Sequence, residues 1–447
     1  MRDLTQGNVF GHIIKFSIPM LLGNLFQQLY NIVDSLIVGN ILGKNSLAAV
    51  GASFPVTFIL ISLVIGFTSG MSVVIAQYYG AKDLKTVKKA IDTLMISVMA
   101  SGVVIGLIGY IFSEQIFILM RFPEEVIPEA ALYFKVVMAG SIFSFGYNGV
   151  SAILHGLGDS KTPLYFLMIA TILNIALDFV FLLWFRWGIG AVAFATVISQ
   201  AVAFTGIVLW LNKKHNFVKI RFRNLEFDKD VFKKSIKIGL PSGVQNTIVG
   251  LSITILLAIV GTFGTETIAG FTVAIRLDAF AMLPAMTIAI ALTSFVGQNI
   301  GAGKLDRVKK AYYSSLLLSA SIAITIGFIL IFWGRFFVGF FTPDIEVQIV
   351  GASMLRIMGG FYVFLAAMFM TNSVLRGAGE AMIPMFVTAF ILLGIRLPLA
   401  YLLSREWSGL GSNGIWWSSP ISWMIGFGSS MYFYKKGKWK EKALIRN

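Results

Sequence analysis

The chain is a succession of long apolar stretches separated by short polar segments. Each stretch has about the 20 residues that an α-helix needs to cross a bilayer core, where backbone polar groups must be bonded within the segment. The stretches are too long and too continuous for membrane-barrel strands, which alternate over about ten residues. We therefore predict an all-α polytopic membrane protein with twelve transmembrane helices. The predicted spans are 13–38, 48–77, 90–113, 131–154, 164–185, 189–211, 236–261, 268–297, 311–334, 349–374, 383–404 and 412–434.

The two halves of the chain repeat each other. Gly80-Ala81 reappears as Gly301-Ala302, and Pro163 reappears as Pro384, so that both pairs are 221 residues apart. Six spans per half is an even number, which makes both halves start on the same side of the membrane. We therefore predict two six-helix lobes, related as a parallel repeat by a pseudo-two-fold axis along the membrane normal. The predicted lobes are 1–212 and 236–447, joined by a cytoplasmic linker at 213–235.

Composition and charge agree with a membrane protein and orient it. The chain is 57% hydrophobic and 13% charged, whereas a soluble domain carries about 25% charged residues. The net charge is +15, and 27 of the 36 Lys and Arg residues fall on the side of both termini and the linker, against five on the other side. By the positive-inside rule, both termini lie in the cytoplasm. The basic excess is thus an orientation signal, and no basic module suggests nucleic-acid binding.

A polar stripe interrupts the first span. Gln27, Tyr30, Asn31 and Asp34 are spaced i, i+3, i+4 and i+7, which places them on one face of a helix. A carboxylate within the bilayer is costly and usually faces a cavity that it serves. Pro19 lies about four turns earlier and permits a kink, because proline removes a helical hydrogen bond. We expect the stripe to face the protein interior and Pro19 to act as a hinge.

A second carboxylate lies in the fifth span. Asn174 and Asp178 are four residues apart on one helical face, and Thr196 adds a hydroxyl from the sixth span. Carboxylate, amide and hydroxyl oxygens suit a hard cation such as Na⁺, and the carboxylates also suit a proton. Two carboxylates in one low-dielectric cavity cannot both stay ionised cheaply. We predict a cation or proton site made of Asp34, Asn174, Asp178 and Thr196.

The second half lacks matching acids, since Asp178 corresponds to Leu399 at the repeat offset. Asp278 follows Arg276 in the eighth span, and a local ion pair or an interfacial anchor is its expected role. Arg396 interrupts the eleventh span, where it could pair with a helix end or cap a cavity. Any ion coupling is therefore expected in the N-terminal lobe.

With these features the chain resembles the multidrug and toxic compound extrusion (MATE) family, and more narrowly its prokaryotic DinF-like branch. The resemblance runs from end to end. It rests on Pro19, Gln27, Tyr30 and Asp34, on the loop Gly156–Pro163, on the Asn174/Asp178 pair and on Thr196.

The resemblance implies a role for several residues. Asp34, Asn174, Asp178 and Thr196 would form the cation or proton site, with Gln27, Tyr30 and Asn148 beside it in the substrate cavity. The implied protein is an antiporter of a prokaryotic cytoplasmic membrane, acting as a monomer. It would export amphipathic, cationic organic compounds using an H⁺ or Na⁺ gradient, without a cofactor.

The alternatives to an antiporter are a flippase, a membrane enzyme, a passive scaffold and a channel. A lipid-linked oligosaccharide flippase of the same superfamily would usually have more spans and a basic cavity. A membrane enzyme is disfavoured because no hydrolytic or nucleotide-binding motif is present. A passive scaffold would not need two buried carboxylates. A channel would be recognised by ion flux without coupling to a solute.

Overall fold

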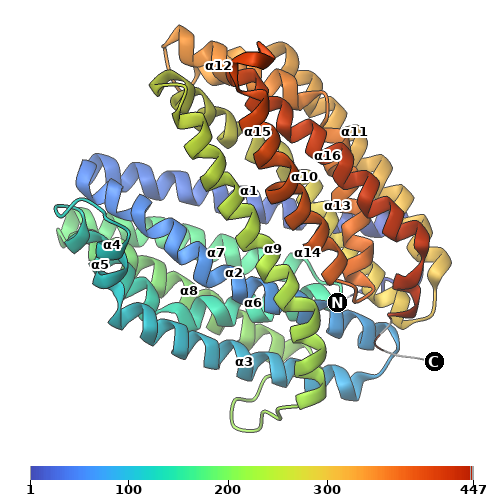
Figure 1. The fold of residues 1–447 in the computed structure, drawn as a ribbon. Coiled ribbons are helices and arrows are strands. Elements are labelled where there is room, and N and C mark those ends of the chain that lie inside the picture. Colours follow the sequence, from blue (N-terminus) through green and yellow to red (C-terminus); the bar gives the residue numbers. More distant parts are fainter. Residues whose placement is uncertain (1, 443, 445–447) are drawn as a thin grey trace. The chain divides into compact units, whose positions relative to one another are not determined.

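The computed structural model describes residues 2–442 and 444, and within them it contains helices and no β-strand. The predicted all-helical fold class is confirmed, and each of the twelve predicted spans coincides with a helix or a helix pair (Figure 1). The helices are α1 (Val9–Ile41), α2 (Lys44–Gly80), α3 (Leu84–Ile111), α4 (Ser113–Leu119), α5 (Ile127–Ala139), α6 (Ser141–Gly156), α7 (Lys161–Phe179), α8 (Ile189–Lys214), α9 (Lys229–Gly261), α10 (Thr265–Gly301), α11 (Leu305–Gly339), α12 (Ile345–Gly359), α13 (Tyr362–Gly377), α14 (Met382–Ala389), α15 (Leu397–Leu403) and α16 (Ser412–Lys436).

Membrane-spanning character follows from helix length and hydropathy. Among the described residues, nine helices are long and apolar enough to cross a membrane, and two bent helix pairs raise this number to eleven. The twelfth predicted span coincides with α16, a helix of 25 residues that is more polar than the others. Some corresponding helices of the two halves have equal lengths: α2 and α10 have 37 residues each, and α6 and α13 have 16 each.

Two predicted spans are not continuous helices. The fourth breaks between α5 and α6 with a bend of 50°, and the tenth breaks between α12 and α13 with a bend of 54°. Gly140 lies at the first break and Gly360 at the second. Glycine weakens a helix because its backbone loses more entropy on folding than that of other residues. A Cβ atom at Gly140 would also lie 2.3 Å from Val197 Cγ2, so a side chain there would require Val197 to shift.

The chain divides into two compact units. Unit 1 comprises Ile18–Gly243 with the residues before Leu4, and unit 2 comprises Leu4–Ser17 and Val244–Asn447. The start of α1 therefore belongs to unit 2, and the start of α9 to unit 1. These limits differ from the predicted 1–212 and 236–447, because α1 and α9 each contribute residues to both units.

Within unit 1, α2 and the first half of α9 approach each other closely. Gly66 and Gly70 on α2 and Gly239 on α9 remove the side chains that would separate the two backbones. A Cβ atom at Gly70 would lie 2.5 Å from Gly239 N and 2.6 Å from Ser235 O. Small residues four apart commonly permit such contacts between membrane helices.

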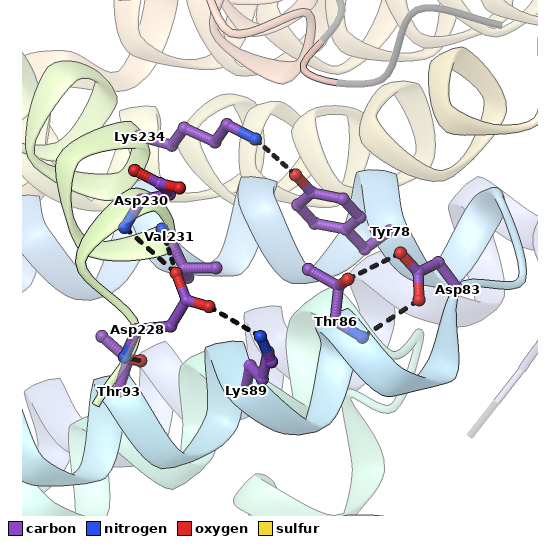
Figure 2. Close-up of polar contacts among 9 residues, drawn as sticks. All are labelled: Tyr78, Asp83, Thr86, Lys89, Thr93, Asp228, Asp230, Val231 and Lys234. Carbon is purple, nitrogen blue, oxygen red and sulfur yellow. Dashed lines mark hydrogen bonds and ion pairs between the residues drawn. The ribbon is translucent and has the colours of Figure 1, made fainter. Parts of the chain in front are cut away.

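Polar contacts hold the start of α9 against α2 and α3 in the same unit (Figure 2). Lys89 Nζ donates to Asp228 Oδ2 over 3.0 Å, and Asp228 N donates to Thr93 Oγ1 over 2.9 Å. Lys234 Nζ donates to Tyr78 Oη over 2.6 Å. The basic segment before α9, predicted to be a linker, is thus fixed to unit 1.

Asp228 also caps α9. Its Oδ1 accepts hydrogen bonds from Asp230 N and Val231 N, both over 3.0 Å. The Val231 N–H and the Lys89 ammonium hold the pKa of Asp228 below its usual range. This is the behaviour of a carboxylate that satisfies free N–H groups at a helix N-terminus.

Unit 2 holds the N-terminal segment in a comparable way. Arg307 donates to the backbone oxygens of Leu4, Gln6 and Gly7 over 2.9–3.1 Å. Lys304 Nζ donates to Thr5 O over 2.9 Å. These donors come from the loop and first turn of α11, so the segment that leads into α1 is fixed to unit 2.

Candidate functional site

The two predicted carboxylates meet inside unit 1. Asp34 on α1 and Asp178 on α7 are 6% and 0% exposed. Their carboxyl groups lie close enough together to form a hydrogen bond when one of them is protonated. One oxygen of each group, Oδ1, is buried and has no hydrogen-bond partner in the part of the chain that the structure describes. The sequence placed each residue on a polar helix face, and the tertiary structure joins the two faces.

Three neutral polar groups complete this cluster. Tyr30 Oη and Thr196 Oγ1 are 3.2 Å apart, and Thr196 Oγ1 also donates to Val192 O over 3.1 Å. Asn174 is 2% exposed. With its amide turned so that both ends are satisfied, Asn174 donates to Asp178 Oδ2 and accepts from Thr196 N, each over 3.2 Å. We name Tyr30, Asp34, Asn174, Asp178 and Thr196 the carboxyl cluster.

The helix that carries Asp178 changes its geometry directly after it. The α-helix α7 ends at Phe179 and continues as a π-helical segment, Val180–Trp184. Single π-helical turns are rare and often occur at functional sites. The eleventh span also contains a π-helical segment, Phe390–Arg396, at a different position along the repeat. Neither segment is visible in the hydrophobic pattern.

The carboxyl cluster offers oxygen atoms of the kinds that hard cations bind. Two carboxyls, an amide oxygen, a hydroxyl and a phenol fit Na⁺ or a proton by their chemistry. Among residues 2–442 and 444, no three His, Cys, Asp or Glu side chains gather as a metal site.

Three other predicted residues lie outside the carboxyl cluster. Gln27 is exposed on α1. Asn148 on α6 donates from Nδ2 to Ser144 O over 2.8 Å, within its own helix. Pro19 is buried inside α1, next to Ile18, the residue at which that helix enters unit 1. Substrate binding by Gln27 and Asn148, and hinge motion at Pro19, stay predictions.

One residue near the cluster was not predicted. Tyr133 on α5 lies close enough to Asp34, Asp178 and Tyr30 to interact with them electrostatically. A tyrosine within an apolar span gives a weak signal, because most such residues pack their rings among apolar neighbours. Only the packing of α5 against the other helices brings Tyr133 to the carboxyls.

The loop Gly156–Pro163, which supported the resemblance, has a structural role. Asp159 accepts from Lys161 N over 3.0 Å, and from Thr162 N and Thr162 Oγ1 over 3.1 and 2.9 Å. Burial raises the pKa of Asp159, but these hydrogen bonds outweigh it and leave the pKa below its usual value. Asp159 thus turns the chain into α7 and fixes the helix that carries Asp178.

Unit 2 contains a different polar cluster. Asp278 Oδ1 accepts from Tyr362 Oη over 2.7 Å, and Arg396 Nε donates to Ser419 Oγ over 3.1 Å. Asp278 and Arg396 also attract each other electrostatically. The expected local pair of Asp278 with Arg276 is wrong: Arg276 is exposed and the partners of Asp278 come from other helices. Residues two apart on a helix do not face each other.

Comparison with known proteins assigns the fold to a family. The MatE family model matches the chain twice, at residues 19–180 and 241–402, which confirms the internal repeat. The probable multidrug resistance proteins YpnP and YoeA of Bacillus subtilis are each 30% identical to this chain over 99% of its length. The match covers 98% of YpnP and 96% of YoeA. The probable multidrug resistance protein NorM of Thermotoga maritima is 26% identical over 97% of the chain and 94% of its own length.

Solved structures agree with this assignment. A crystal structure of MATE in the bent conformation matches with a TM-score of 0.92 and 27% identity, covering 98% of this chain and 97% of that one. A structure in the straight conformation matches with a TM-score of 0.91 and 26% identity, covering 99% of both chains. A transporter of the MOP superfamily from Pyrococcus furiosus matches with a TM-score of 0.91 and 27% identity over 98% of both.

Proposed function

The chain belongs to the MatE family of multidrug efflux transporters, and on that premise we propose that it is a secondary antiporter. It exports amphipathic, cationic organic compounds in exchange for H⁺ or Na⁺, using the carboxyl cluster of unit 1. The observation that carries this proposal is the buried contact between Asp34 and Asp178. A lipid-linked oligosaccharide flippase is not favoured, because the similar proteins are multidrug resistance proteins.

The coupling ion acts on the contact between Asp34 and Asp178. Two negative charges this close repel strongly where water is excluded, so the pair needs a proton or a metal cation to stay together. Loss of the ion separates the carboxylates and opens the cluster to water. Because Asp34 lies on α1, this change moves the helix that contains Pro19, whose missing hydrogen bond lets the helix bend.

An ion can drive export only if it binds one conformation more tightly than the other. The ion-filled carboxyl cluster favours a contracted site, and the ion-free cluster favours an open site that accepts the organic cation. Bent and straight conformations are named in the structures of similar MATE proteins. We infer that Pro19 bends α1 between two such forms in this chain.

The bias of Lys and Arg supports an orientation with both termini in the cytoplasm, in the cytoplasmic membrane of a prokaryote. The carboxyl cluster is complete within one chain, which supports a functional monomer. Gln27, Tyr30 and Asn148 are proposed as substrate contacts. Tyr30 would serve both substrate and ion through its bond to Thr196.

Counterflow of a fluorescent organic cation in proteoliposomes tests the proposal, with pH and Na⁺ gradients imposed separately. Wild-type protein should accumulate the dye under one gradient. Asp34→Asn and Asp178→Asn should each lose gradient-driven accumulation, because an amide takes up no proton near neutral pH and has no negative charge to balance a bound cation. Glu124→Gln, an exposed loop variant, serves as the control for loss of one acid. Unchanged gradient-driven transport by both aspartate variants would exclude the carboxyl cluster as the coupling site.

A further inference from the structure

Arg376 is a positive charge in unit 2 that has no acidic partner among the described residues. It lies in the last turn of α13, and its Nη2 donates to Gln245 Oε1 over 2.9 Å. Its Nε atom is buried and has no acceptor within residues 2–442 and 444. Among the residues that the structure describes, no Asp or Glu oxygen lies within ion-pair distance of this guanidinium. Glu380, one turn along the chain, pairs with Lys442 over 3.3 Å instead.

The residues around Arg376 fix its position but do not use all of its hydrogen-bond donors. Gln245 Nε2 donates to Thr388 Oγ1 over 2.8 Å, which fixes the amide so that its oxygen faces the arginine. The next residue, Gly377, packs so tightly that a Cβ atom there would lie 2.7 Å from Thr293 O. The end of α13 is therefore fixed, and Arg376 is oriented before any ligand arrives.

A guanidinium has five donors arranged to match the two oxygens of a carboxylate. Here one donor is used by a neutral amide, and the buried Nε is unused. The Arg376 side chain is partly buried, and a partly buried charge without an ionic partner is costly, which makes such a residue a candidate for ligand binding. The group that would complete this site is an anion with two oxygens.

We propose that Arg376, with Gln245, is a binding site for a carboxylate carried by the exported compound. The proposal rests on the antiporter function proposed above and extends it. The carboxyl cluster of unit 1 handles the coupling ion, whereas Arg376 of unit 2 admits zwitterionic amphiphiles in addition to purely cationic ones. An anionic lipid headgroup could offer the same pair of oxygens, and the test below separates the two sources.

The test compares two dyes that differ only in one carboxyl group. Rhodamine B is a zwitterion, and its ethyl ester is a cation with the same ring system. Transport of each is measured in proteoliposomes of phosphatidylcholine alone and in others that contain phosphatidylglycerol. Arg376→Gln should raise the KM for rhodamine B by about tenfold, the effect of losing a hydrogen bond to a charged group, and leave the ester unchanged. Arg376→Lys keeps the positive charge, so its KM for rhodamine B should lie between those of Arg376→Gln and the wild type.

Gln245→Glu provides a second, independent variant. It places a carboxylate against Arg376, so the site is filled from within and rhodamine B should lose its binding while the ester is still exported. Arg335→Gln is the matched control, because Arg335 also faces a glutamine, Gln348, over 3.5 Å but is exposed. This control should transport both dyes as the wild type does.

Several results would overturn the proposal. Equal effects of Arg376→Gln on both dyes, or export of the ester but not of rhodamine B by the wild type, would exclude a carboxylate site while leaving the antiporter function intact. An equal effect on both dyes that requires phosphatidylglycerol would assign the anion to a lipid headgroup. Export of neither dye by the wild type, under either gradient, would contradict the antiporter function itself.

Discussion

Replacement of Gly70 by alanine should separate two helices of unit 1. The new Cβ atom would lie 2.5 Å from Gly239 N, 2.6 Å from Ser235 O and 2.7 Å from Gly239 Cα. Non-bonded heavy atoms prefer about 3.5–4.0 Å, so the helices must move apart by about 1 Å. All three neighbours are backbone atoms, which cannot rotate away as the end of a side chain can.

The size of the effect follows from two opposing contributions. Overpacking of a tight contact costs about 1–3 kcal/mol, and the upper part of this range applies where only backbone can yield. Alanine is favoured over glycine within a helix by about 1 kcal/mol, which offsets part of the loss. We expect Gly70→Ala to destabilise the protein by about 1–2 kcal/mol, and the apparent Tm of a chain of 447 residues to fall by about 1–2 °C.

The assay is thermal unfolding in detergent, followed by the intrinsic fluorescence of the nine tryptophans at a fixed heating rate. Gly51→Ala is the matched control on the same helix, because a Cβ atom at Gly51 meets nothing within 4 Å. That control should be as stable as the wild type or slightly more stable. A Gly70→Ala protein with an unchanged or raised Tm, or one that behaves like Gly51→Ala, would refute the reasoning.

Three further predictions concern side chains that form hydrogen bonds. Asp228→Ala removes the cap of α9 and should lower the free energy of unfolding by about 1 kcal/mol. Because the pKa of Asp228 is lowered in the folded protein, this stabilisation is full above the ordinary aspartate pKa and is lost as the pH falls through the lowered pKa. The Tm difference between Asp228→Ala and the wild type should therefore shrink in acid. Tyr362→Phe deprives Asp278 of its 2.7 Å donor and should cost about 1.5–3 kcal/mol by thermal unfolding, whereas Tyr313→Phe, at an exposed ring, should cost almost nothing. Thr196→Val keeps the side-chain shape but removes the hydroxyl bonded to Tyr30. It should raise the coupling-ion concentration that gives half-maximal transport about fivefold. An unchanged half-maximal concentration would exclude Thr196 from the site.

Much of the fold could be predicted from the apolar stretches, because burial in a bilayer imposes a length and a helical backbone on each segment. The breaks near Gly140 and Gly360 could not. A glycine is common in membrane helices, and whether it bends one depends on what packs there, such as Val197 beside Gly140. The π-helical segments could not be predicted either, because they leave the hydrophobic pattern unchanged.

The sequence by itself determined which helix faces are polar. The spacing of Tyr30 and Asp34, and of Asn174 and Asp178, follows from the helical period alone. Only the tertiary structure decided that these faces meet, that Tyr133 joins them, and that Asp278 bonds to Tyr362 and not to its neighbour Arg276. Helical periodicity acts over a few residues, whereas contacts between helices depend on the packing of side chains from distant parts of the chain.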